Sequence, residues 1–121
     1  MTDVSAKRVL LVDDSRVARL TLQHLIKLTN ENIEITQAAN GDEALAIFKP
    51  DAFDLALLDF NMPGIDGLEL ARLIREQDSN IHLVLVTANI QDTIVARAKT
   101  MGLDFLGKPV DPEQLAQFLK G

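Results

Sequence analysis

The chain has 121 residues, of which 47% are hydrophobic, and this length and composition suit one compact domain with its own core. Its formal net charge of −6 argues against a nucleic-acid-binding surface, which needs clustered Lys and Arg. We recognise no membrane-spanning apolar run and no signal peptide, and the absence of cysteine excludes disulfides and thiolate chemistry. We therefore expect a single cytoplasmic domain over residues 1–121, with a loose N-terminal tail at 1–6 and no membrane contact.

Five short apolar segments predict β-strands, in chain order at 8–13, 33–38, 53–59, 82–87 and 103–107. Three of them contain an uninterrupted apolar run, which is typical of central strands covered on both faces: Val9–Val12, Leu55–Leu58 and Leu83–Val86. The segment 33–38 alternates apolar and polar residues, which favours an edge strand.

Helix start signals separate these strands. The spacing of a capping box occurs twice, in Asn40 with Glu43 and in Asp66 with Glu69. Further signals are Ser15 or Asp14 as the cap of the first helix, Asp111 before Pro112 at the last helix, and Gly102 as a helix stop. Strands and helices thus alternate five times, which predicts an α/β fold: a doubly wound, five-stranded parallel sheet, (βα)5, with helices on both faces.

Side chains that can do chemistry follow four of the five predicted strands. Asp13 and Asp14 end the first strand, Asp59 the third and Thr87 the fourth, and Lys108 follows the fifth. In an open parallel sheet the carboxyl ends of the strands meet at one edge, where ligands bind. Three clustered carboxylates need more positive charge than one lysine supplies, and oxygen ligands suit Mg²⁺. The sequence therefore predicts a magnesium site at this edge.

Such a site suits phosphoryl transfer. A carboxylate can attack phosphorus and form an acyl phosphate, while a metal, a lysine and a hydroxyl stabilise the transferred oxygens. Asp59 is the best nucleophile candidate because its strand is expected between the acid pair and the Thr87–Lys108 side. Simpler interpretations remain: Asp13 and Asp14 as one helix cap and one solvated acid, and Asp59 as the start of the turn before "NMPG".

Four motifs together carry a resemblance that spans about residues 7–120: "LLVDDS", "DLALLDFNMPGIDGLEL", "LVLVTA" and "GLDFLGKP". With them the chain resembles the receiver domain of two-component response regulators. The resemblance implies a flavodoxin-like strand order, 2-1-3-4-5. It also implies that Asp59 accepts a phosphoryl group from a histidine kinase or a histidine phosphotransfer protein. The domain would then be a phosphoprotein of a phosphorelay and not an enzyme, apart from self-catalysed transfer and dephosphorylation.

The resemblance also implies ligands for the metal. Asp14, Asp59 and the backbone carbonyl of Asn61 would bind Mg²⁺, or Mn²⁺ in its place, and Asp13 would act partly through water.

A conformational switch is implied as well. Thr87 would hydrogen-bond the phosphoryl group, Lys108 would pair with it, and the Lys108–Pro109 peptide would be cis. Phe105 would turn inward when Thr87 moves, and Ala88 would leave the phosphoryl site open. Asn89 is either a cap of the fourth helix or a residue that tunes the lifetime of the phosphate.

The output surface would be formed by the fourth helix, the fifth strand and the fifth helix, and dimerisation through it is possible. Its apolar candidates are Ile90, Ile94, Val95, Phe105 and Leu115. His24 and His82 are expected to be structural or exposed. Two other functions remain open: a receiver-fold interaction module that is not phosphorylated, and a Mg²⁺-dependent phosphohydrolase that uses Asp59.

Overall fold

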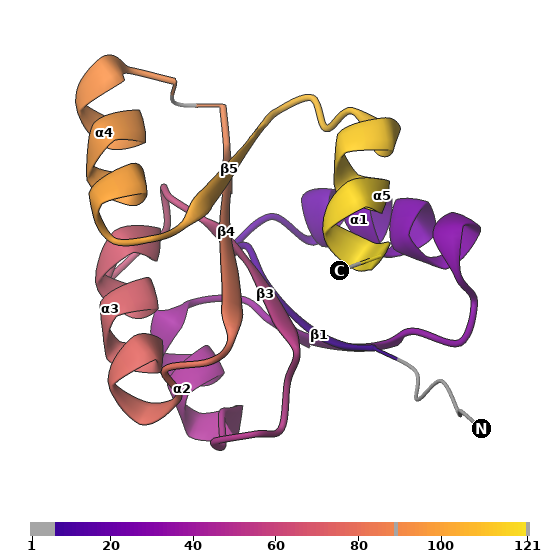
Figure 1. Cartoon of the computed structure of the whole chain (residues 1–121), viewed down its shortest axis with the longest axis horizontal. Helices are drawn as coiled ribbons and strands as arrows, with labels where there is room; N and C mark the ends of the chain where they lie inside the picture. The colour runs from indigo at the N-terminus through magenta and orange to yellow at the C-terminus, as the bar shows by residue number, and fades with distance from the viewer. Residues whose placement is uncertain (1–6, 89, 121) are drawn as a thin grey trace.

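One parallel sheet of five strands organises the molecule (Figure 1). The structure is a computed structural model that describes residues 7–88 and 90–120, so the expected tail at 1–6 lies outside the described residues. The strands are β1 Arg8–Val12, β2 Glu34–Ala38, β3 Leu55–Asp59, β4 His82–Thr87 and β5 Asp104–Gly107. Their order is β2-β1-β3-β4-β5, which confirms the predicted strand order.

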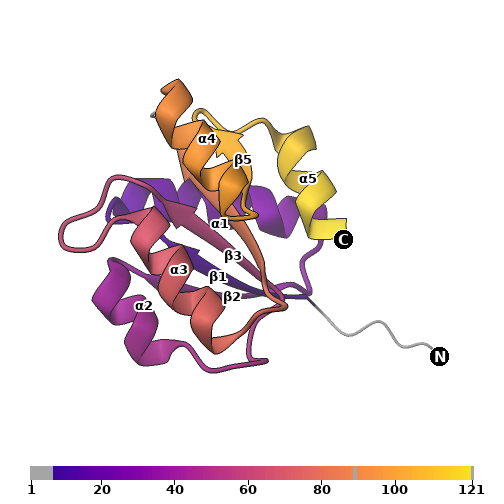
Figure 2. The ribbon, with the colours of Figure 1, turned by 60° about the vertical axis from the view of Figure 1, so that its left-hand side comes forward.

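Helices alternate with these strands and cover both faces of the sheet. They are α1 Arg16–Thr29, α2 Gly41–Ile47, α3 Gly67–Gln77, α4 Asp92–Thr100 and α5 Pro112–Lys120. Helices α1 and α5 pack on one face, while α2, α3 and α4 lie on the other (Figures 1 and 2). The described part of the chain contains no helix that is long and apolar enough to cross a membrane.

The alternation of side chains along each strand divides the core into two layers. Val9 and Leu11 of β1 pack under α1 and α5, while Leu10 and Val12 pack under α2 and α3. Every residue of β3 is buried, as the uninterrupted apolar run predicts. Each large apolar side chain buried in this way contributes about 1.5–3 kcal/mol, so the central strands are held firmly in place.

The outer strand β2 matches the edge position that its alternating pattern favours. Its burial rises along the strand, from exposed Glu34 to buried Ala38. The strand is paired with β1 alone among the described strands, in parallel register from Arg8 opposite Glu34 to Val12 opposite Ala38.

The predicted strand 53–59 begins two residues later than expected, at Leu55, and side-chain contacts of Phe53 and Asp54 mark the two residues before it. The carboxylate of Asp54 accepts hydrogen bonds from the backbone amide of Arg8, at 2.8 Å, and from its guanidinium, at 3.1 and 3.2 Å. Phe53 is buried, but it stacks on Phe48 with ring centroids 5.9 Å apart. Phe53 and Asp54 therefore anchor the loop that precedes β3.

Side-chain caps define three helix starts. The Ser15 hydroxyl accepts a hydrogen bond from the Ala18 amide at 3.2 Å, so Ser15, and not Asp14, is the N-cap of α1. Asn40 caps α2, at 2.8 Å from the Glu43 amide, and Asp66 caps α3 in the same way.

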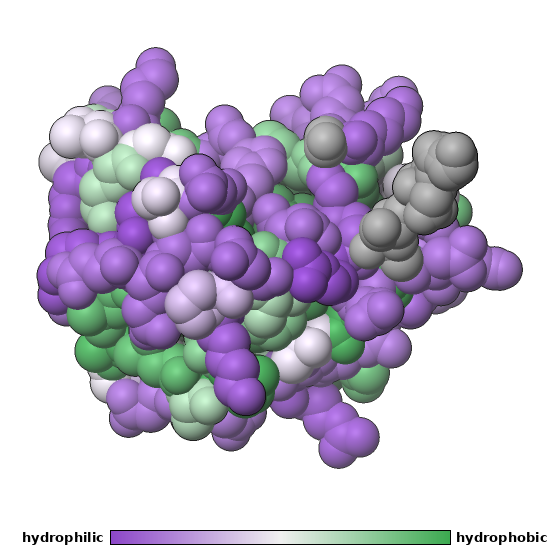
Figure 3. Space-filling model, turned by 60° about the horizontal axis from the view of Figure 1, so that its bottom comes forward, coloured by the Kyte–Doolittle hydropathy of each residue, from purple (hydrophilic) through white to green (hydrophobic). Residues whose placement is uncertain are grey.

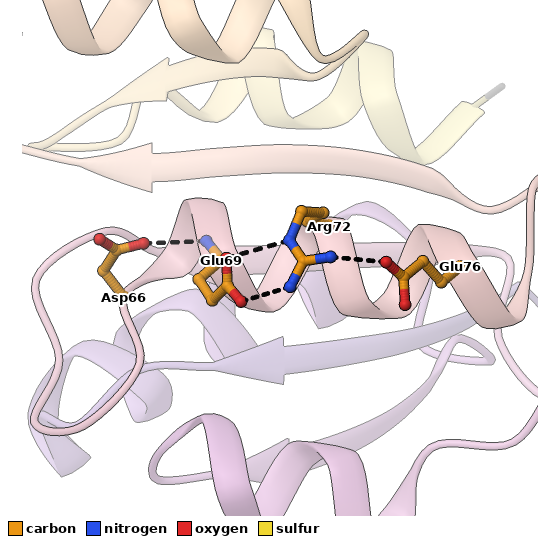
Figure 4. Close-up of polar contacts among 4 residues, drawn as sticks. All are labelled: Asp66, Glu69, Arg72 and Glu76. Carbon is orange, nitrogen blue, oxygen red and sulfur yellow. Dashed lines mark hydrogen bonds and ion pairs between the residues drawn. The ribbon is translucent and has the colours of Figure 1, made fainter.

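Helix α3 also carries a surface network of charged side chains (Figure 4). The carboxylate of Asp66 accepts from the Glu69 amide at 2.9 Å. Arg72 then bridges Glu69 at 2.6 Å and Glu76 at 2.5 Å, one turn on either side. These pairs are exposed, so each adds only a few tenths of a kcal/mol to the helix.

Helix α4 begins at Asp92, with Gln91 at its N-cap position, whereas the cap predicted at Asn89 lies outside the described residues. Its end follows the prediction. Gly102 has a φ of 77°, its amide donates to the Lys99 carbonyl at 3.0 Å, and the Leu103 amide donates to the Ala98 carbonyl at 2.9 Å. This is a Schellman ending, which favours glycine at the left-handed position.

Candidate functional site

Three aspartates meet at the carboxyl edge of the sheet. Asp13 and Asp14 follow β1 directly, and Asp59 is the last residue of the neighbouring β3. One carboxylate oxygen from each lies within 4.8 Å of the others. Asp13 is only 2% exposed and Asp59 only 7%, whereas Asp14 is exposed. Two buried carboxylates and one accessible carboxylate therefore form a site that opens to solvent on one side.

Lys108 reaches this cluster from the turn that follows β5. Its ammonium lies 2.7 Å from Oδ2 of Asp13 and 3.6 Å from Oδ1 of Asp59. The backbone amide of Lys108 donates to the Thr87 carbonyl at 3.1 Å, and the Lys108–Pro109 peptide is cis. The lysine thus joins the ends of β1, β3, β4 and β5.

The site is short of positive charge. Burial raises the pKa of Asp59 to about 6, repulsion from Asp13 and Asp14 adds to this rise, and Lys108 opposes it. Burial alone would lower the pKa of Lys108, but its hydrogen bond to Asp13 and the charge of Asp59 leave that pKa raised. When all four groups are ionised, the lysine offsets one of three negative charges.

The donor set fits a hard divalent cation. Carboxylate oxygens are the ligands that Mg²⁺ prefers, and a divalent ion would balance the two charges that Lys108 leaves. A groove of about 370 Å³ lies beside the exposed carboxylate, and its lining includes Asp14, Phe60, Asn61 and Asp66. Water and an incoming group can therefore reach the cluster from this side.

Thr87 and Phe105 occupy the positions that the sequence indicates. Thr87 is the last residue of β4, is 1% exposed, and lies opposite Gly107 in the register of β4 and β5. Phe105 lies opposite Leu85, is partly buried, and packs against the core on the α4 side. Ala88 is exposed directly after β4.

Two of the five apolar candidates for the output surface are buried in the core. Leu115, on α5, is fully buried and Ile94, on α4, is 8% exposed, because both face the core. Ile90 is 65% exposed, and Val95 and Phe105 are partly buried. A 3.6-residue apolar repeat marks the inner side of a helix, so such a pattern selects core residues before surface ones.

Two residues that shape the site escaped sequence reasoning. A Cβ atom on Gly67 would lie 2.3 Å from the carbonyl oxygen of Asp59, so only glycine lets the first turn of α3 approach the end of β3. The sequence signal was a glycine directly after the Asp66 cap. The second residue is Arg19, whose guanidinium donates to the carbonyl of Asp13 at 2.6 Å. An arginine in a first helical turn gives no such signal.

A large cavity lies at the opposite edge of the sheet. It measures about 880 Å³, and its lining includes Arg8, Asp54, Asp78 and His82. Figure 3, with the bottom of Figure 1 turned forward, shows a mostly hydrophilic face with separate hydrophobic patches. His82 is partly buried, contacts Asp104 at 2.5 Å and makes a T-shaped ring contact with Phe118, with ring centroids 5.6 Å apart. This cavity is separate from the carboxylate cluster.

Three aspartates and a lysine thus lie at the carboxyl edge of a five-stranded α/β fold. The sequence profile of the response regulator receiver domain matches residues 9–120. The chain therefore belongs to the response regulator receiver domain family.

Known proteins agree with this assignment. Sporulation initiation phosphotransferase F of Bacillus subtilis is 32% identical over 115 residues, which cover 94% of this chain and 91% of that protein. Transcriptional regulatory protein ResD of Bacillus subtilis is 34% identical over 99% of this chain, which spans only 49% of ResD. Several of the relatives are thus about twice as long as this chain or longer.

Solved structures show the same architecture. A CheY-like receiver domain protein from Methanospirillum hungatei superposes with a TM-score of 0.86 at 28% identity, covering 96% of this chain and 92% of that one. Chemotaxis protein CheY4 of Vibrio cholerae gives a TM-score of 0.80 at 30% identity, with coverage of 95% and 97%.

Proposed function

We propose that this domain is a phosphoacceptor that takes a phosphoryl group onto Asp59 in a Mg²⁺-dependent reaction. The observation that carries this proposal is the pairing of a buried Asp59 with Asp13, Asp14 and Lys108 at one sheet edge. The donor would be a phosphohistidine of a kinase or a phosphotransfer protein, and the reaction would take place in the cytoplasm. The name of the relative phosphotransferase F supports this class of reaction.

In the proposed transfer an oxygen of the Asp59 carboxylate forms a bond to phosphorus as the bond from phosphorus to the donor histidine nitrogen breaks. The histidine nitrogen keeps the electron pair of that bond, and the product is an acyl phosphate on Asp59. Lys108 neutralises charge on the phosphoryl oxygens, and the Thr87 hydroxyl donates a hydrogen bond to one of them. Asp14, Asp59 and the Asn61 carbonyl would hold Mg²⁺, with Asp13 acting through water, and the bound ion supplies further charge neutralisation.

Phosphorylation would then shift the domain toward a second conformation that an output partner or domain prefers. Thr87 and Phe105 are the proposed switch residues, and the α4–β5–α5 surface is the proposed output or dimer contact. Ile90 is the most exposed of its five apolar candidates, at 65%.

Acetyl phosphate tests the proposal without a kinase. The native protein, incubated with acetyl phosphate and Mg²⁺, should gain a single phosphoryl adduct in its intact mass. The adduct should be absent in Asp59→Asn and after removal of Mg²⁺, while the exposed-site control Glu31→Gln should react as the native protein does.

Two other outcomes would replace the proposal. No adduct at any Mg²⁺ concentration would favour a receiver-fold interaction module that is not phosphorylated. Rapid multiple turnover of small phosphate esters would favour a phosphohydrolase.

A further inference from the structure

The side chain of Arg19 joins three elements next to the carboxylate cluster. It comes from the first turns of α1, and its Nη1 donates to the backbone carbonyl of Asp13 at 2.6 Å. Its Nε donates to the side-chain oxygen of Gln37, on the edge strand β2, at 3.1 Å. The amide of Gln37 in turn contacts the side chain of Gln23, one turn further along α1. Gln37 therefore fixes the orientation of the guanidinium that binds the backbone at the end of β1.

Arg19 completes a set of bonds that fix Asp13. The Asp13 amide donates to the Ala38 carbonyl at 3.2 Å, which extends the β1–β2 ladder by one residue. Its carboxylate accepts from the Ser15 amide at 2.9 Å and from Lys108 at 2.7 Å. Arg19 binds the backbone carbonyl of Asp13, and this carbonyl is part of the peptide bond between Asp13 and Asp14.

This peptide matters because it carries the accessible carboxylate. A peptide unit is planar, so a fixed Asp13 carbonyl also fixes the backbone nitrogen and the Cα atom of Asp14, from which its side chain extends. Asp14 is exposed, whereas Asp13 and Asp59 are held in the core. The hydrogen bond from Arg19 thus helps to set the direction of the Asp14 side chain.

We propose that Arg19, supported by Gln37, is a positioning residue that sets the Asp13–Asp14 peptide and thereby the affinity of the site for a divalent cation. This inference rests on the proposed metal site. Charge alone would give Arg19 the opposite effect, because a cation beside the site repels Mg²⁺. The sign of the change on removing Arg19 therefore separates positioning from simple electrostatics.

The test measures Mg²⁺ affinity in the absence of any phosphodonor, by following backbone amide resonances during a titration with MgCl₂. Arg19→Met should weaken binding about 10-fold or more, the usual effect of losing a group that orients a ligand. Arg19→Lys, which keeps the charge and one donor, should recover part of this loss. Arg16→Met is the matched control, because it removes an exposed arginine from the same helix start and should leave the affinity equal or slightly tighter.

Equal or tighter binding in Arg19→Met would overturn the inference. If Arg19→Met does not fold, Gln37→Met decides: it leaves every charge in place and should still weaken binding, and unchanged affinity would overturn the inference. A native protein that binds no Mg²⁺ would defeat the proposed function itself. Native binding with an unaffected Arg19→Met would defeat only the role of Arg19.

Discussion

At the scale of single residues, Asp59 shows the electrostatic cost of a buried carboxylate. Its carboxylate is 7% exposed and lies beside two other carboxylates, so burial and repulsion both destabilise its ionised form. Lys108 relieves part of this repulsion, at 3.6 Å from one carboxylate oxygen. The site thus stores electrostatic repulsion that a bound cation would release.

Replacing Asp59 should stabilise the metal-free protein at neutral pH. The folded-state pKa is raised from 3.8 to about 6, so this group favours folding below pH 4 and loses that contribution as the pH rises through 6. The shift corresponds to ~3 kcal/mol, and screening by water reduces this, so we expect Asp59→Asn to gain about 1–2 kcal/mol at pH 7. Urea unfolding in EDTA at pH 7 and pH 4 measures this.

The gain in unfolding free energy from Asp59→Asn should shrink toward zero at pH 4, where the carboxyl group of Asp59 is largely protonated in the native protein. Glu31→Gln, which removes one exposed charge, should change little at either pH. A gain of equal size at both pH values would contradict the argument from burial and repulsion.

The same pKa predicts how metal binding depends on pH. A proton and a divalent cation compete for Asp59, so Mg²⁺ affinity should be constant well above pH 6 and fall as the pH drops below about 6. Titrations with MgCl₂ at pH 5, 6, 7 and 8 test this dependence. An affinity that stays level down to pH 5 would show that Asp59 is not a ligand.

At the scale of elements, the turns show how polar groups decide where helices and strands end. Asp78 closes α3, and its two carboxylate oxygens accept from the Asp51 and Asn80 amides, each at 3.0 Å. Asp51 has a φ of 64°, a left-handed conformation that Asp tolerates better than most residues. One buried carboxylate therefore joins the turn after α2 to the turn before β4.

Asp78→Asn should destabilise the protein at neutral pH. Backbone hydrogen bonds from Asp51, Asn80 and Ile81 lower the pKa of Asp78 despite its burial, so its contribution is present above pH 4 and is lost as the pH falls through the lowered pKa. Loss of hydrogen bonds to a charged group costs about 1.5–3 kcal/mol. Thermal unfolding at pH 7 should show this cost, and it should shrink in acid.

Ser79→Ala, an exposed change in the same turn, is the control and should have almost no effect. A penalty for Asp78→Asn that is as large at pH 2 as at pH 7 would point to a steric cause.

At the scale of the whole molecule, the site depends on contacts between distant parts of the chain. Asp13 and Lys108 are 95 residues apart, yet their side chains lie 2.7 Å from each other. The strand order makes this contact possible, because β3 lies beside β1 and precedes β4 and β5 in the sheet. A cation that binds this cluster therefore binds the folded state alone.

Mg²⁺ should consequently stabilise the entire domain. At a concentration ten times its dissociation constant, the expected gain in unfolding free energy is ~1.4 kcal/mol. Thermal unfolding with MgCl₂ and with EDTA measures the gain, and Asp14→Ala should abolish it. A gain that persists in Asp14→Ala would show that the ion binds elsewhere.

The sequence by itself determined the fold class and the three aspartates and the lysine that meet at one edge of the sheet. Uninterrupted apolar runs such as Val9–Val12 require burial on both faces, and the capping residues Asn40 and Asp66 satisfy helix amides within three residues. These are local requirements, so a linear pattern can express them. The aspartates and Lys108 could be placed because parallel strands all end at the same edge.

Only the tertiary structure decided which side chains from different helices and strands come into contact. It showed that Ile94 and Leu115 face the core, that Gly67 touches the end of β3, and that Arg19 binds the Asp13 carbonyl. Each of these facts depends on how one element packs on another. Packing selects one helix face and one side-chain direction by the fit of complete surfaces, and no short stretch of sequence contains that information.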